Sequence, residues 1–164
     1  RQNEIMKYCI LSNLVFTSLI QKDIKSGFDY LNRIDERFTD DLDLRMYKCL
    51  LYYFGHEYTK SKECIASFFR DVKNSKYHEN FIRALKYMMD NKPMKAIANF
   101  ETCYQIALKN GQYDRAIFVL KQLNELYLDH GLQNKLKKVK ELQENFYKMS
   151  YANQIIEEIG LKLN

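Results

Sequence analysis

Short polar breaks interrupt this chain at nearly regular intervals, and they constrain its fold more than any other feature. Four breaks separate segments with apolar periodicity: Gln21-Lys22-Asp23, Gly55-His56-Glu57, Asp90-Asn91-Lys92 and Asp129-His130-Gly131. Their centres, at 22, 56, 91 and 130, are 34, 35 and 39 residues apart. A period of this length is typical of stacked repeats in which each unit is a pair of helices.

The composition also favours helices. The 164 residues include only 5 Gly and 1 Pro, whereas a sandwich or barrel uses many of both in its turns. Asp41 is placed to cap a helix, and Gly111 and Gly131 are placed where helices stop. The pattern predicts helices over residues 3–20, 24–37, 41–54, 58–73, 77–89, 93–109, 112–129 and 132–149.

A second pattern supports the repeat independently of the breaks. Two helices that cross closely need a small side chain early in the second helix, and the breaks place Gly27, Ser61 and Ala96 at that position. The residues twelve positions earlier, in the first helix of each pair, are Val15, Cys49 and Ala84. Amphipathicity alone does not require a small residue at a fixed offset from each break, so this register predicts three similar helix pairs.

The stretch from Asn80 to Leu108 resembles the tetratricopeptide family most. Its residues Ala84, Tyr87, Ala96, Phe100 and Cys103 follow the family's alternation of small and aromatic positions, although Arg83 stands where a leucine is usual. The resemblance implies an all-α fold, a right-handed superhelix of about four stacked helix–turn–helix repeats over residues 1–149. Residues 150–164, with Ile155, Ile156 and Ile159, are expected to form a C-terminal capping or dimerisation helix.

Motifs for catalysis, metals and cofactors are missing from the sequence. No phosphate-binding glycine loop, zinc motif or EF-hand loop occurs. Serine, histidine and acidic residues are present, but no motif places them together. The acidic cluster Asp35, Glu36, Asp40, Asp41 and Asp43 is interpreted as a turn that starts a helix. The four cysteines are interpreted as reduced, buried side chains. We therefore expect a chain that is not an enzyme, with no catalytic residue, metal or cofactor.

The first helices of the stacked pairs are expected to line a concave face that binds a peptide. Aromatic and methionine side chains offer adaptable contact area, and an asparagine amide both donates to and accepts from a peptide backbone. The alternative is that the apolar members pack between neighbouring units. The predicted peptide-binding residues are Asn13, Phe16, Met46, Tyr47, Tyr53, Phe81, Leu85, Asn124 and Tyr127.

With a composition rich in Lys, Asn, Ile and Tyr, the chain also looks like the C-terminal sensor half of the Gram-positive peptide-responsive transcriptional regulators. That resemblance implies a cytoplasmic protein that binds a short peptide or protein segment and forms a homodimer. DNA would then be read upstream of Arg1, with no direct nucleic-acid contact by these residues. No segment has the roughly 20 apolar residues of a membrane span, so no membrane contact is expected. Two alternatives stay open: an adaptor or oligomerisation domain without a small ligand, and a peptide-responsive regulator of a phosphatase or kinase partner.

Overall fold

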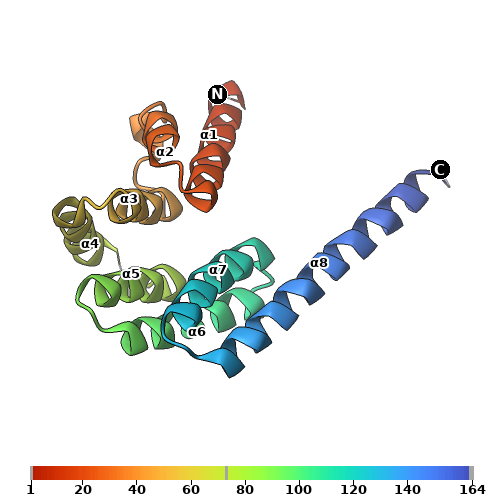
Figure 1. The fold of residues 1–164 in the computed structure, drawn as a ribbon. Coiled ribbons are helices and arrows are strands. Elements are labelled where there is room, and N and C mark those ends of the chain that lie inside the picture. The colour runs from red at the N-terminus through yellow and green to blue at the C-terminus, as the bar shows by residue number, and fades with distance from the viewer. Residues whose placement is uncertain (1, 73, 163–164) are drawn as a thin grey trace. The chain divides into compact units, whose positions relative to one another are not determined.

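The described part of the chain consists of eight α-helices and one short 3₁₀ helix, without a strand (Figure 1). The structure is a computed structural model that describes the backbone of residues 2–72 and 74–162, and the side chains of 2–72 and 74–148. The all-α prediction is therefore confirmed. The elements are α1 Gln2–Gln21, α2 Ile24–Leu31, η1 Glu36–Phe38, α3 Leu42–Phe54, α4 Tyr58–Asp71, α5 Lys76–Met89, α6 Pro93–Lys109, α7 Tyr113–Asp129 and α8 Gln133–Lys162.

Two predicted boundaries differ from the structure. The helix expected over 24–37 ends at Leu31, because Asp35 is extended (φ −61°, ψ 139°) and its carboxylate accepts a hydrogen bond from the Arg37 amide to start η1. The boundary expected between 149 and 150 lies inside α8, which has 30 residues in total and continues to Lys162. No Gly or Pro occurs in α8 before Gly160, near its end, so the sequence has no helix breaker at the expected boundary. The side chains of Ile155, Ile156 and Ile159, on which the dimerisation prediction rests, lie outside the described side chains.

The chain divides into two units, residues 1–106 and 107–164, so that the division falls within α6. Unit 1 contains α1 to α5 and most of α6. In it α1 packs on α2, and α3 packs on α4. In unit 2, α7 packs on α8 through Leu136 and Val139, which are buried.

The predicted small positions lie at helix contacts in unit 1. Ser61 is fully buried, and its hydroxyl donates a 3.0 Å hydrogen bond to the carbonyl of Cys49, twelve residues earlier. Gly27 is buried against Leu51 of α3, where an added Cβ would lie 2.5 Å from the Leu51 Cδ2 atom. Ala84 and Ala96 are also fully buried. The small side chains therefore permit close helix packing, as the register predicts.

One turn geometry recurs at the predicted breaks. Lys22, His56, Asn91 and Gly131 all have φ between 53° and 66°, and Gly111 has the same left-handed conformation between α6 and α7. After each of these residues, the next amide donates to the carbonyl five residues earlier, as from Glu57 to Tyr52 (2.8 Å) and from Lys92 to Tyr87 (2.8 Å). This is the Schellman ending of a helix, in which a left-handed residue closes the last turn. The breaks are thus confirmed as turns of one kind.

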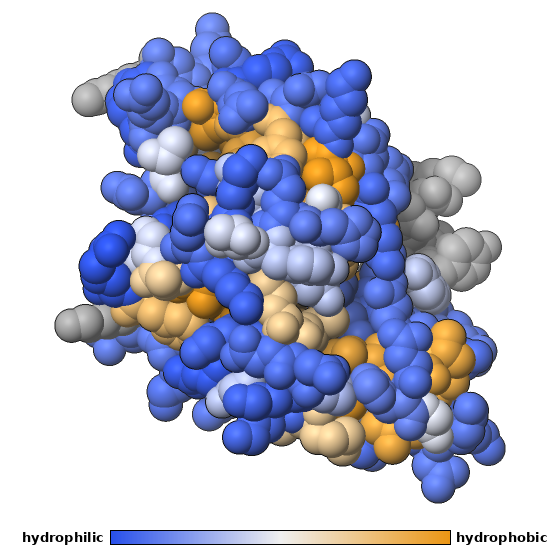
Figure 2. Space-filling model, turned by 60° about the vertical axis from the view of Figure 1, so that its left-hand side comes forward, coloured by the Kyte–Doolittle hydropathy of each residue, from blue (hydrophilic) through white to orange (hydrophobic). Residues whose placement is uncertain are grey.

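The face shown in Figure 2 is mostly hydrophilic, with apolar side chains in separate patches. The exposed apolar residues include Ile5, Met6 and Ile10 of α1, each more than half exposed. Among the described residues, no helix has the length and apolar character needed to cross a membrane.

We expect Gly27→Ala to lower the free energy of unfolding by about 1–3 kcal/mol, because the new methyl group would press on Leu51 in a filled core. Urea denaturation followed by circular dichroism measures the change. Adding Leu51→Val makes room, so the double variant should recover part of the loss. If Gly27→Ala lowers the free energy of unfolding equally with and without Leu51→Val, contact with Leu51 is not the cause of the loss.

Candidate functional site

The structure separates the nine predicted peptide-binding residues into two groups. Met46, Phe81, Leu85 and Tyr127 are at most 4% exposed. Phe81, for example, packs edge-on against Phe100 with ring centroids 5.0 Å apart. These four side chains pack in the core rather than lining an open face, because the inward sides of their helices are covered by neighbouring helices. For these four residues, the alternative interpretation, that they pack between neighbouring helices, describes the structure.

The other five residues keep some access to solvent. Asn13 is exposed, while Phe16, Tyr47, Tyr53 and Asn124 are half-buried. Phe16 of α1 and Tyr47 of α3 are brought together, with ring centroids 5.7 Å apart. The Oδ1 atom of Asn124 in unit 2 is buried without a hydrogen-bond partner. Binding of a peptide by these five residues stays a prediction.

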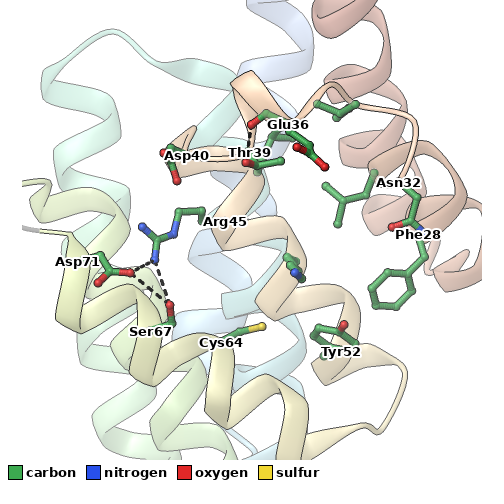
Figure 3. A pocket seen from close by; sticks show the side chains of 14 residues that line it. Phe28, Asn32, Glu36, Thr39, Asp40, Arg45, Tyr52, Cys64, Ser67 and Asp71 are labelled. Atoms are coloured by element: carbon green, nitrogen blue, oxygen red, sulfur yellow. Dashed lines mark hydrogen bonds and ion pairs between the residues drawn. The ribbon is translucent and has the colours of Figure 1, made fainter.

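A pocket of about 540 Å³ lies elsewhere on unit 1, between α2, α3, α4 and the connection that contains η1 (Figure 3). Its walls include Phe28 and Leu31 from α2, and Leu44, Arg45, Lys48 and Tyr52 from α3. Glu36, Thr39 and Asp40 come from the connection, and Cys64, Ser67 and Asp71 come from α4. The pattern of first-helix residues gave no indication of this pocket.

The early end of α2 creates the space. α2 has 8 residues and α4 has 14, which correspond to lengths of about 12 and 21 Å at a rise of 1.5 Å per residue. The connection from Asn32 to Asp40 lines the pocket beyond the end of α2. The signal in the sequence was Asp35, a residue that competes for backbone hydrogen bonds and stops the helix.

Charged side chains on one wall are held in place by α4. The Arg45 Nη2 atom lies 3.0 Å from Asp71 Oδ2, and the Ser67 hydroxyl donates to the same oxygen at 3.3 Å. The hydrogen bond from Arg45 holds the pKa of Asp71 below its ordinary value. The Arg45 guanidinium also lies over the Phe68 ring, 5.7 Å from its centroid. This network orients Arg45, whereas Lys48 is exposed beside it.

The opposite end of the pocket is aromatic. The rings of Phe28 and Tyr52 meet with centroids 4.9 Å apart and an interplanar angle of 50°. Figure 3 shows these rings at one end and Glu36, Thr39 and Asp40 at the other. The pocket therefore combines an apolar end with an acidic end.

The cysteines differ from the prediction that all four are buried. Cys49 and Cys103 are buried, but Cys64 is half-buried at the pocket and Cys9 is exposed on α1. A hydrogen bond between the Cys49 and Cys64 thiols raises the pKa of Cys49 and lowers the pKa of Cys64. Burial further raises the pKa of Cys49, and the positive charge of Lys48 further lowers the pKa of Cys64.

The structure also joins a serine, a histidine and an acid that no motif connects. Ser75 Oγ lies 2.6 Å from His78 Nδ1, and His78 Nε2 lies 2.7 Å from Asp43 Oδ1. The His78 side chain is only 5% exposed, and none of the three residues lines the pocket. The arrangement links the start of α5 to α3.

The acidic cluster acts as predicted in its helix-starting role. Asp41 accepts hydrogen bonds from the amides of Asp43 (2.9 Å) and Leu44 (3.1 Å) at the start of α3. Asp35 caps η1 and pairs with Arg37. Across the described residues, no group of three histidine, cysteine or acidic side chains is arranged to hold a metal ion.

Comparisons of this chain with protein-family models, with curated proteins and with solved structures return no match. Its function is therefore argued from the geometry of its own residues.

We expect Asp43→Ala to lower the free energy of unfolding by about 1–3 kcal/mol, because a nitrogen of the buried His78 ring would lose its partner. Thermal and urea denaturation measure the loss. Asp40→Ala, which removes an exposed acid from the same segment, serves as the control and should change stability by less than about 0.5 kcal/mol. Equal effects of the two changes would contradict the role given to the His78 contact.

We expect Cys64 to react with iodoacetamide at a lower pH than an ordinary thiol, whose pKa is about 8.5, because a depressed pKa leaves more thiolate near neutrality. Labelling rates measured by peptide mass spectrometry across a pH series give the midpoint. Cys49→Ala removes the hydrogen-bond donor and should move the midpoint upward. An unchanged midpoint in Cys49→Ala would contradict the effect of Cys49 on the pKa of Cys64.

Proposed function

We propose that this chain is a binding module for a short peptide or protein segment, and that the segment docks in the pocket between α2, α3 and α4. The observation that carries the proposal is the pocket itself. Its volume of about 540 Å³ falls in the range of roughly 300–1,000 Å³ that is common for ligand sites. Its lining also combines aromatic rings with a few oriented charges, as such sites do.

The chemistry of the two ends defines the segment. The Phe28 and Tyr52 rings suit an aromatic or aliphatic side chain, because such contact buries apolar area. Glu36 and Asp40 at the other end suit a basic group. Arg45 already pairs with Asp71, so its role is to shape the wall between the two ends. A segment with an apolar residue and a nearby Lys or Arg matches this arrangement.

Selection of a random phage-displayed peptide library on the full chain tests the proposal. Enriched peptides should carry an aromatic or aliphatic residue near a basic one. Glu36→Lys combined with Asp40→Lys should weaken their binding at least tenfold, since contacts between charged groups contribute about 1.5–3 kcal/mol and each 1.4 kcal/mol is tenfold. Isothermal titration calorimetry measures the affinity.

The matched control makes the same charge change outside the pocket. Asp29→Lys combined with Asp129→Lys alters two exposed acids that do not line it, and affinity should change less than threefold. Repeated selections without an enriched peptide would contradict a peptide-binding role. If the peptides bind the variant with Glu36→Lys and Asp40→Lys at unchanged affinity but lose affinity for Tyr47→Ala, the binding site is the predicted first-helix face and not the pocket.

We further propose that the module is the ligand-sensing and dimerisation part of a transcriptional regulator. The resemblance to tetratricopeptide repeats supports this reading, and so does the recurrence of one turn geometry between the paired helices, at positions 22, 56, 91 and 131, with one further turn of this kind at Gly111 between α6 and α7. The superhelical stacking and cytoplasmic location belong to the same proposal.

α8 supports a dimer, or the alternative of an oligomerisation domain without a small ligand. Its 30 residues extend about 45 Å, whereas the 17 residues of its partner α7 extend about 25 Å. α7 is therefore too short to cover α8. Light scattering after size exclusion should give a dimer mass, and a monomer at high concentration would contradict both readings.

A further inference from the structure

A serine, a histidine and an aspartate form a continuous chain of hydrogen bonds between α5 and α3. The Ser75 Oγ atom lies 2.6 Å from the Nδ1 atom of His78, and the Nε2 atom of the same ring lies 2.7 Å from Asp43 Oδ1. Both distances are at the short end of the range for protein hydrogen bonds. A hydroxyl that contacts an imidazole, which a carboxylate orients in turn, is the arrangement that activates a serine as a nucleophile.

The start of α5 brings the hydroxyl to the ring. Ser75 is the residue before this helix and His78 is its third residue, so both side chains belong to the same turn. A serine at such a position usually accepts a hydrogen bond from a backbone amide of the first turn. The Ser75 side chain makes no such bond, and its hydroxyl contacts His78 instead.

Asp43 decides which nitrogen of the His78 ring carries the hydrogen. An ionised carboxylate only accepts hydrogen bonds, so Nε2 donates to Asp43 and the Nδ1 atom of the neutral ring keeps its lone pair. That lone pair accepts the hydroxyl hydrogen of Ser75. His78 is thus in the tautomer that a general base needs, and burial holds the ring in place because its side chain is only 5% exposed.

The serine is accessible although its base is buried. Ser75 is half-buried, and the residues on either side of it, Asn74 and Lys76, are exposed. The first amides of a helix have no partner within the helix, and the helix dipole makes this end favourable for negative charge. An oxyanion that forms on a substrate attached to Ser75 would therefore lie close to a stabilising helix start.

We propose that Ser75 is a nucleophile that cleaves carboxylic esters, with His78 as its general base and Asp43 as the positioning residue. Ser75 lines neither the 540 Å³ pocket nor the cavity of about 190 Å³ beside α1, so the geometry favours a small acyl group over a long chain. The inference does not rest on the proposed peptide-binding function. It departs from the expectation of no catalytic residue, which rested on local motifs, because folding joins residues that are 35 positions apart.

The reaction balances with one ester and one water. The Ser75 oxygen attacks the carbonyl carbon of the ester while its proton passes to His78 Nδ1. The bond from that carbon to the alcohol oxygen breaks, the alcohol leaves with the proton from His78, and Ser75 is acylated. Water then attacks the acyl carbon and gives a proton to His78. The bond to the Ser75 oxygen breaks, His78 returns the proton to Ser75, and the carboxylic acid is released.

Two other serines serve as internal controls. Ser26 and Ser67 are half-buried, as Ser75 is. The Ser67 hydroxyl donates to the Asp71 carboxylate at 3.3 Å, and within the described residues neither Ser26 nor Ser67 bonds to a histidine. If accessibility alone decided reactivity, the three serines would react alike. If the imidazole activates the hydroxyl, Ser75 reacts first.

Labelling of the full chain with a fluorophosphonate probe, which attaches to activated serine hydroxyls, tests the proposal. Peptide mass spectrometry should locate the probe on Ser75 and not on Ser26 or Ser67. The chain should also hydrolyse p-nitrophenyl acetate and carry an acetyl group on Ser75 during turnover. Ser75→Ala should abolish both labels, and His78→Gln should lower the labelling rate at least about 100-fold, the usual contribution of a general base. Ser26→Ala is the matched control and should label at the rate of the parent chain.

Asp43→Asn tests the positioning role. The new amide can donate to Nε2 and leave the ring hydrogen on Nδ1, where the ring cannot take the Ser75 proton. We expect the kcat for p-nitrophenyl acetate to fall at least about tenfold with KM unchanged, because Asp43 orients the base and does not contact the ester. Asp43→Glu restores a carboxylate and should recover part of the rate.

Circular dichroism of each variant before labelling verifies that it folds. A folded parent chain that takes up no probe at Ser75 would overturn the proposal. Labelling of Ser26 or Ser67 as fast as Ser75 would overturn it too, since the hydroxyl would then owe its reactivity to access alone. An unchanged rate in folded His78→Gln would exclude His78 as the base.

Discussion

The close approach of paired helices at small side chains is the constraint on which the rest of unit 1 depends. At the contact between α3 and α4, Ser61 is fully buried and bonds to the carbonyl of Cys49. A larger residue would separate the helices and open the packing around Phe68 and Leu50, both at most 1% exposed. Gly27 has the same effect where α2 meets Leu51. Core packing tolerates such changes poorly because protein interiors are already densely filled.

The left-handed turns provide the second constraint. Each turn reverses the chain at the end of a helix and satisfies a carbonyl that the helix itself leaves unpaired. Lys22, His56 and Asn91 adopt a left-handed backbone that is energetically unfavourable for residues with a Cβ atom. Glycine adopts the same conformation at positions 111 and 131 without that cost. The turn geometry therefore depends on the positions of the helices as well as on the residue type.

The candidate pocket lies at the one helix pair of unit 1 whose second helix is short. α2 is the shortest α-helix in the described part of the chain, and the connection through η1 follows it. The space that remains is lined by side chains from three helices, and it brings Arg45, Asp71 and Cys64 together from positions up to 26 residues apart. The proposed binding site thus lies where this helix pair differs from its neighbours, beyond the early end of α2.

The sequence by itself determined the helical character of the chain, most of the helix positions, the turns between paired helices and the small residues at their contacts, but not the early end of α2 or the length of α8. These features follow from local periodicity, from capping residues such as Asp41 and from glycines at 111 and 131. Only the tertiary structure decided which apolar side chains are buried, so Phe81 and Leu85 proved to be core residues although their spacing also suited a binding face. It also decided the pairing of His78 with Asp43. Helix periodicity fixes the face of a helix on which a residue lies, but burial and pairing depend on the neighbouring helix that covers that face.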